Sequence, residues 1–171
     1  SNAVTGQRSL YFYAYHPSSA SSTSIYSYTT LPEFARPVNT LELTFNMRRY
    51  GTTGNTYTSL ILVGVMSNPN DINTFVAVDS IDLHAEAGSS IHEINVSFAG
   101  YTGTGTRIAL LAPVPPLYGT GTYTYNYCYI DDIYVAPMSP CPRAFDLTAT
   151  NATQSSVDLG WTDTIGSTQW T

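Results

Sequence analysis

The 171-residue chain contains no lysine, and all six of its basic residues are arginine. Together with twelve acidic residues they give a formal net charge of -6 at pH 7. We therefore expect no nucleic-acid partner, because phosphate binding requires a basic surface that replaces counterions. No apolar run approaches the roughly 20 residues that a membrane-spanning helix needs, so no membrane span is expected either.

Cysteine is also scarce. The two cysteines, Cys128 and Cys141, are too few for a disulfide scaffold and lack the spacing of a metal site. They either pair with each other, or Cys128 is a buried thiol and Cys141 bonds to a residue outside this chain. The histidines, His16, His84 and His92, show no paired metal spacing. Since neither a nucleophile elbow nor a phosphate-binding loop is present, we expect a non-catalytic protein.

Threonine, serine, tyrosine, glycine and valine dominate the composition, and 14 residues are tyrosine. Only 11% of residues are charged. This composition predicts an all-β protein, because a helical one would carry far more Glu, Lys and Leu. It also fits a secreted or cell-surface location. Residues 1–3, Ser-Asn-Ala, look like the scar of a cleaved expression tag.

Alternation of apolar and polar residues predicts short strands along most of the chain. The clearest spans residues 40–48, with Leu41, Leu43, Phe45 and Met47 on one face. Residues 57–67 are apolar on both faces, which predicts a central strand. The remaining strands are expected at residues 8–15, 24–31, 75–83, 91–98, 106–112 and 123–135. Their regular spacing predicts an antiparallel β-sandwich or barrel.

A proline-rich linker at residues 137–142 separates this domain, residues 4–136, from a tail at residues 143–171. The tail has strand candidates at residues 145–150 and 155–161. Two strands alone expose their edges and an apolar face. We therefore expect an ordered tail to pack against the sandwich or against another copy of the chain.

Two resemblances refine this interpretation. The tail, with Ser156-Val-Asp-Leu-Gly-Trp161, resembles the opening of a fibronectin type III domain, which implies that Trp161 is a core residue. The main body resembles jelly-roll modules of bacterial surface proteins of the MAM and cleaved-adhesin type. Its matching segments are Gly6-Gln-Arg-Ser-Leu-Tyr-Phe, Leu41-Glu-Leu-Thr-Phe, Val63-Gly-Val-Met-Ser-Asn-Pro-Asn-Asp, Thr74-Phe-Val-Ala-Val and Tyr129-Ile-Asp-Asp-Ile-Tyr-Val.

The second resemblance implies a jelly-roll sandwich that mediates adhesion to a glycan or a cell-surface protein, beside neighbouring domains of the same polypeptide. Two alternatives stay open. One is a structural spacer or protein-docking module without a small-ligand site. The other is an accessory domain of a larger hydrolase.

Four tyrosines of the last strand share one face and form the candidate ligand site: Tyr123, Tyr125, Tyr127 and Tyr129. Sugars present apolar C–H faces and hydroxyl rims, so aromatic rings beside hydrogen-bonding groups suit them. Asn46, Arg48 and Asn126 are the expected polar neighbours. The alternative is that the tyrosines are ordinary strand residues packed against their neighbours.

Asp131 and Asp132 are adjacent in a strand, so regular alternation directs them to opposite faces and excludes a paired acid/base role. One carboxylate should then point inward or toward an edge, where it needs a cation or several donors. A structural calcium ion would satisfy it, and jelly rolls of the resembling type often hold one near this position. Backbone amides or Arg107 are the alternative partners.

Overall fold

The structure is a computed structural model that describes residues 4–17, 24–49, 57–86, 90–115, 124–139 and 145–162. The presumed tag scar at residues 1–3, Tyr123, and linker residues 140–142 with Cys141 lie outside these ranges. The chain divides into two compact units, Ser1–Ala136 and Pro137–Thr171. No helix in the described ranges has the length and apolarity to cross a bilayer.

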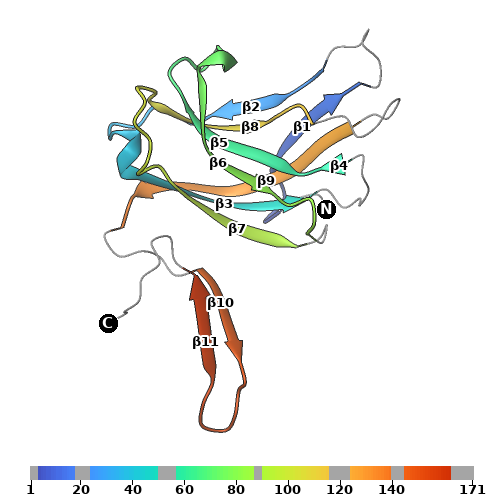
Figure 1. The fold of residues 1–171 in the computed structure, drawn as a ribbon, viewed down its shortest axis with the longest axis vertical. Helices are drawn as coiled ribbons and strands as arrows, with labels where there is room; N and C mark the ends of the chain where they lie inside the picture. Colours follow the sequence, from blue (N-terminus) through green and yellow to red (C-terminus); the bar gives the residue numbers. More distant parts are fainter. Residues whose placement is uncertain are drawn as a thin grey trace. The chain divides into compact units, whose positions relative to one another are not determined.

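The first unit consists of two β-sheets (Figure 1). The first sheet has the order β1 (Leu10–His16), β9 (Thr124–Pro137), β3 (Leu41–Arg49) and β7 (Ile91–Ser97), and the short β4 (Tyr57–Thr58) pairs in parallel with the start of β9. The second sheet has the order β2 (Ser27–Thr30), β8 (Arg107–Ala112), β5 (Leu60–Met66) and β6 (Phe75–Asp82). Single 3-10 turns precede β3 and β6, at Val38–Thr40 and Ile72–Thr74. The predicted all-β class and the predicted strands are confirmed.

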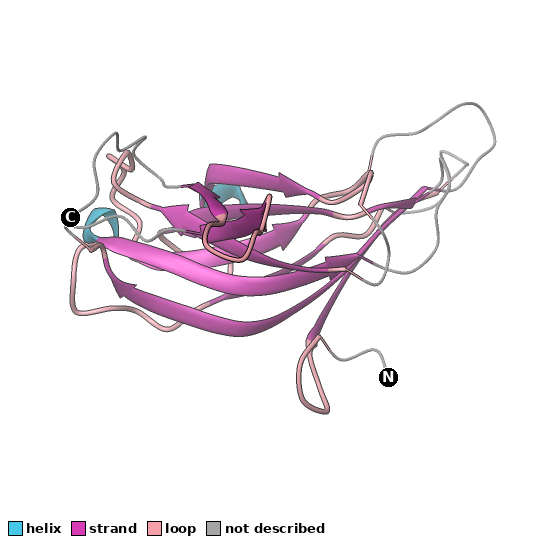
Figure 2. Ribbon diagram, turned by 90° about the horizontal axis from the view of Figure 1, so that it is seen from below, coloured by secondary structure: helices cyan, strands magenta, loops and turns pink. Residues whose placement is uncertain are grey.

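The two sheets lie one above the other (Figure 2) and share one hydrophobic core. Burial along β3 alternates at every residue, with Leu43, Phe45 and Met47 at 0% exposure. These side chains belong to the same core as Val63 of β5 and Leu110 of β8, which confirms the predicted inward face and the sandwich. β5 lies between β8 and β6 and is buried on both faces near its end, as the unbroken apolar run predicted.

Cys128 lies in this core as a free, fully buried thiol. Of the two alternatives left open for the cysteines, the buried thiol at Cys128 is therefore the one that the structure supports, and a bridge to Cys141 is not. Position 128 faces inward because it alternates with the outward Tyr127. Burial raises the pKa of the Cys128 thiol, which keeps it protonated.

A buried asparagine joins the two sheets where the chain crosses from β4 to β5. Asn126 of β9 is 0% exposed. Its Oδ1 accepts from the backbone N–H of Leu60 at 2.8 Å, and its Nδ2 donates to the carbonyl oxygens of Leu60 at 2.8 Å and Pro113 at 3.2 Å. Ser59 Oγ also donates to the carbonyl oxygen of Tyr127 at 2.6 Å. The Asn126 side chain thus gives hydrogen-bond partners to backbone groups that the strand pairing of the two sheets leaves without them.

In the second unit β10 (Phe145–Thr150) and β11 (Asp158–Thr162) form an antiparallel hairpin. Its apolar side chains are exposed: Leu147 at 73%, Leu159 at 61% and Trp161 at 42%. Trp161 is thus not buried within this hairpin, and its place in the core of a fibronectin type III fold stays a prediction. Two strands have too little area to enclose a side chain of that size.

Candidate functional site

Six tyrosines cover the outward face of β1 and β9. Because Phe12, Ala14, Cys128 and Ile130 face the core, the alternating tyrosines face away from it. Register pairs them across the two strands as Tyr11 with Tyr129, Tyr13 with Tyr127, and Tyr15 with Tyr125. The paired ring centroids are 5.2, 5.2 and 5.3 Å apart. We name this set the tyrosine face: Tyr11, Tyr13, Tyr15, Tyr125, Tyr127 and Tyr129.

Exposure is graded across the tyrosine face. Tyr11 is 50% exposed, Tyr129 only 7%, and the other four are partly buried. Burial and, to a smaller extent, the neighbouring Tyr125 raise the pKa of Tyr13, so this phenol stays neutral and keeps its O–H donor. The face is therefore a packed wall of rings with an accessible end at Tyr11. Sequence reasoning predicted the tyrosines of β9 as a site but missed those of β1.

Of the predicted polar neighbours, only Arg48 contacts the tyrosine face. Its guanidinium carbon lies 5.2 Å from the centre of the Tyr129 ring, a cation–π distance. Asn46, two residues earlier on the same face of β3, donates from Nδ2 to Asp132 Oδ2 at 2.9 Å. Asn126 is wrong as a site residue because it faces the interior, where its three hydrogen bonds hold the sheets together.

The two adjacent aspartates reach the same partner, so their predicted opposite orientation is wrong. Thr5 Oγ1 lies 3.2 Å from Asp131 Oδ2 and 2.9 Å from Asp132 Oδ2. Asp132 has a left-handed backbone with φ of 51°. Ile130 faces the core before this point and Ile133 packs against the core after it, so the alternation shifts by one residue, as at a β-bulge.

Backbone amides satisfy Asp131. The amide of Asp132 donates to Asp131 Oδ1 at 2.9 Å and lowers the pKa of Asp131, burial opposes this effect, and the bonds from Thr5 add to the lowering. Of the alternatives weighed for this carboxylate, amide hydrogen bonding is confirmed. Pairing with Arg107 is wrong, because Arg107 pairs with Glu33 at 3.3 Å.

Calcium takes six to eight oxygen ligands. Two carboxylates, the Thr5 hydroxyl and the Asn46 amide are the oxygen-bearing groups gathered around Asp131 and Asp132. Within the described ranges no three or more His, Cys, Asp or Glu side chains form a metal-binding group. The cluster has oxygen ligands for part of a calcium shell, and a bound calcium ion stays a prediction.

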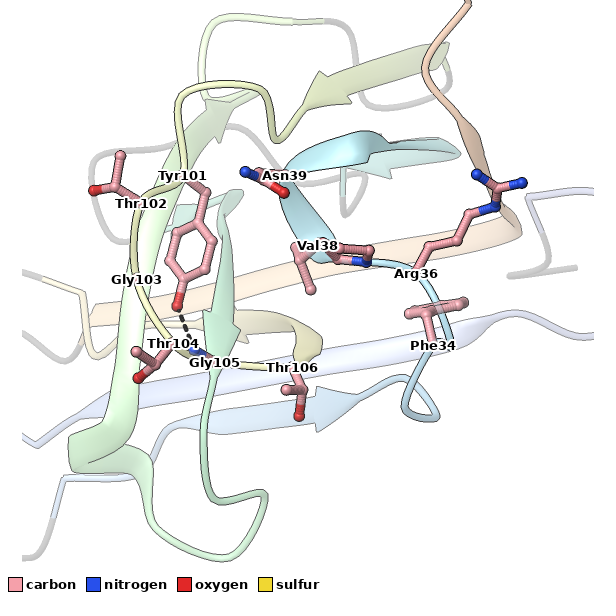
Figure 3. A pocket seen from close by; sticks show the side chains of 11 residues that line it. Phe34, Arg36, Val38, Asn39, Tyr101, Thr102, Gly103, Thr104, Gly105 and Thr106 are labelled. Atoms are coloured by element: carbon pink, nitrogen blue, oxygen red, sulfur yellow. Dashed lines mark hydrogen bonds between the residues drawn. The ribbon is translucent and has the colours of Figure 1, made fainter.

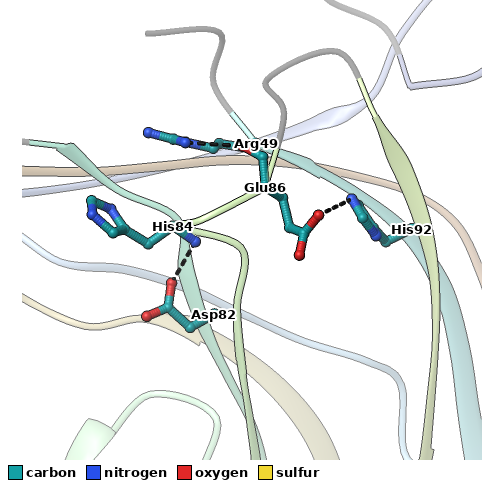
Figure 4. Close-up of polar contacts among 5 residues, drawn as sticks. All are labelled: Arg49, Asp82, His84, Glu86 and His92. Carbon is teal, nitrogen blue, oxygen red and sulfur yellow. Dashed lines mark hydrogen bonds and ion pairs between the residues drawn. The ribbon is translucent and has the colours of Figure 1, made fainter. Parts of the chain in front are cut away.

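Two of the three histidines, His84 and His92, belong to a polar cluster at the turn after β6 (Figure 4). Arg49 is 3% exposed and donates to the carbonyl oxygen of Glu86 at 3.0 Å. His92 Nε2 lies 3.8 Å from Glu86 Oε2, and the amide of His84 donates to Asp82 Oδ1 at 2.8 Å. These contacts hold the turn against β3 and β7.

A pocket of about 350 Å³ lies between the loop before β3 and the loop before β8 (Figure 3). The pocket was missed because its walls are separated by more than 60 residues and meet only in the folded sandwich. The chain matches no family model, no curated protein and no solved structure in comparisons with known proteins. The fold and the site define the class as an antiparallel β-sandwich with a tyrosine-rich outer face.

Proposed function

We propose that the first unit is a non-catalytic adhesion module of a secreted or cell-surface protein and that it binds carbohydrate at the tyrosine face. The observation that supports this most is the register of six tyrosines on β1 and β9, with Arg48 beside them. Ring faces suit the C–H surfaces of sugars, and phenol and guanidinium groups supply hydrogen bonds to hydroxyls.

The strand order supports a jelly roll of the MAM or cleaved-adhesin type. Along the chain the strands of the two sheets alternate, apart from the consecutive β3 and β4 of the first sheet and the hairpin of β5 and β6 in the second. The last strand, β9, lies between β1 and β3, and β8 lies between β2 and β5. Such interleaving fits the paired Greek keys of an eight-stranded jelly roll.

The charge around the tyrosine face favours a neutral glycan. Arg48 is the cation in contact with a ring. Asp132 accepts from Asn46, which lies two residues before Arg48 on the same face of β3, and Asp131 shares the Thr5 hydroxyl with Asp132. Two carboxylates beside one guanidinium disfavour an acidic ligand.

The test is isothermal titration with soluble neutral polysaccharides that a glycan array selects. Tyr11→Ala removes the most accessible ring of the face and should weaken binding by about tenfold, as expected for an aromatic contact residue. Tyr26→Ala is the matched control, because Tyr26 is 45% exposed and precedes β2 of the other sheet. A wild type without affinity for any neutral glycan, or equal losses in both variants, would refute the proposal.

A protein-docking module is the second candidate, and the 7% exposure of Tyr129 favours it. Tightly packed tyrosines resemble the buried part of protein interfaces, where this residue is enriched. Cross-linking at Tyr11 in the native setting would then capture a protein partner, while the glycan titration gives no heat.

We also propose a structural calcium ion at Asp131 and Asp132. Thr5 and the Asn46 amide oxygen, after rotation of the amide, would complete the protein side of the shell. Added calcium should raise the melting temperature relative to chelator, and Asp132→Asn should abolish the difference. An identical melting temperature with calcium and with chelator in the wild type would contradict this site.

A further inference from the structure

The pocket shown in Figure 3 lies away from the tyrosine face and has a rigid wall. Tyr101, 8% exposed, accepts a hydrogen bond at its hydroxyl from the amide of Gly105 at 2.8 Å. A Cβ atom at Gly103 or Gly105 would collide with the Tyr101 ring or hydroxyl. The amide of Thr106 donates to the carbonyl oxygen of Met66 at 3.2 Å, which fixes the end of the loop to β5. This wall is therefore formed before any ligand arrives.

The opposite wall is also fixed. The backbone N–H and the hydroxyl of Thr40 both donate to the carbonyl oxygen of Pro37, at 3.0 and 2.7 Å. Val38, 5% exposed, anchors this turn in the core. A volume of about 350 Å³ between two fixed loops is within the range of small-ligand sites, roughly 300–1,000 Å³.

The lining carries polar side chains that make no hydrogen bond or ion pair within the described part of the chain: Arg36, Asn39, Thr102, Thr104 and Thr106. They supply a guanidinium, an amide and three hydroxyls. Phe34, Pro37 and Val38 add apolar surface. Hydroxyl and amide groups around a small apolar floor match the alternating O–H and C–H surface of a sugar ring.

The charge of the residues that line the pocket determines which kind of sugar it favours. Among the lining residues that the structure describes, Arg36 is the charged one and none is acidic. Glu33, three residues earlier, is paired with Arg107 at 3.3 Å. The pocket is thus locally cationic on a chain whose net charge is -6. Arg36 stands at the rim in Figure 3, with its guanidinium extended away from Tyr101.

We propose that this pocket binds an acidic saccharide, with the sugar carboxylate at Arg36 and the ring hydroxyls at Asn39 and the threonines. A guanidinium presents two parallel N–H donors that match the two oxygens of a carboxylate. The rim position leaves the carboxylate partly hydrated while the neutral part of the ring enters the pocket. This site is independent of the tyrosine face, whose charge disfavours the same ligand.

The experiment compares an oligogalacturonate with a neutral oligogalactose of the same length by isothermal titration calorimetry. The wild type should bind the acidic oligosaccharide at least tenfold more tightly. Arg36→Gln should remove that preference, Arg36→Lys should retain part of it, and Asn39→Ala should weaken binding of the acidic ligand. Arg36 is exposed and bonds to no other residue in the part of the chain that the structure describes, so these variants should fold normally, which circular dichroism checks.

Two arginines outside the pocket serve as matched controls. Arg8→Gln removes the same charge from another exposed position and should leave binding unchanged. Arg48→Gln tests the tyrosine face and should also leave the acidic ligand unaffected. Loss of acidic binding in Arg48→Gln but not in Arg36→Gln would overturn the proposal and place the ligand on the tyrosine face. Equal affinity for both oligosaccharides, no binding, or preference for a sulfated galactan of the same length would also overturn it.

Discussion

Replacing Asn126 by alanine removes three hydrogen bonds that join the two sheets of the first unit. The N–H and C=O groups of Leu60 lose partners at 2.8 Å, and the carbonyl oxygen of Pro113 loses one at 3.2 Å. Because Asn126 is 0% exposed, water does not reach this point without local rearrangement. The variant therefore leaves buried backbone groups unpaired in addition to losing the bonds.

Each buried polar group without a partner costs about 1–3 kcal/mol. Two to three such groups give a loss of roughly 3–6 kcal/mol, against a total of about 5–15 kcal/mol for an ordinary domain. For a unit of this length such a loss lowers the melting temperature by about 10 °C or more. Asn126→Asp should be as damaging, because its carboxylate keeps an acceptor for the Leu60 amide but meets two carbonyl oxygens without a donor.

The assay is urea unfolding followed by far-ultraviolet circular dichroism, which gives the free energy of unfolding from midpoint and slope. Asn46→Ala is the matched control. Asn46 makes one exposed hydrogen bond, to Asp132, and its loss should cost less than about 1 kcal/mol. If the free energy of unfolding of Asn126→Ala lay within 1 kcal/mol of the wild-type value, or equalled that of Asn46→Ala, the hydrogen bonds of Asn126 between the two sheets would contribute little to stability.

Three further predictions follow from burial, hydrogen bonding and close packing. In a Cys141→Ser background the Cys128 thiol should resist Ellman's reagent until the protein unfolds, since burial blocks access and raises its pKa; fast reaction of folded protein contradicts this. The lowered pKa of Asp131 contributes stability above the ordinary aspartate value of about 4, and this contribution is lost as pH falls below it. Asp131→Asn should therefore flatten the acid-side fall in melting temperature, and an unchanged pH profile refutes the assignment. Gly64→Ala should cost about 1–3 kcal/mol, because its Cβ would collide with the carbonyl oxygen of Val76, whereas Gly100→Ala points into open space and should be neutral; equal melting temperatures argue against the collision.

Local patterns were sufficient to predict the strands. Alternation within β3 placed every side chain on its observed face, because a regular strand and a single buried side leave one solution. The apolar run of β5 likewise predicted a strand with neighbours on both sides. These inferences need no knowledge of which strand pairs with which.

The sequence does not show which strands lie beside each other in the sheets, and this pairing determines which residues form the site. The tyrosines of β9 acquire their partners only because β1, more than 100 residues away, lies beside them in register. The same limit hid the loop pocket, whose walls come from residues 34–39 and 101–106. Alternation also fails where the backbone departs from a regular strand, as at Asp132 with its φ of 51°. The Asp131-Asp132 pair is the feature of the sequence that could have indicated this departure, since aspartate tolerates a positive φ better than most residues.

All 14 tyrosines lie in the first unit, and both tryptophans, Trp161 and Trp170, lie in the second. Light of a wavelength that tyrosine does not absorb therefore excites indole alone and reports only on the hairpin unit. The near-ultraviolet dichroism of the packed phenol rings reports on the sandwich. The protein thus carries two natural optical labels, and the order in which its parts melt can be measured in one sample without any added dye.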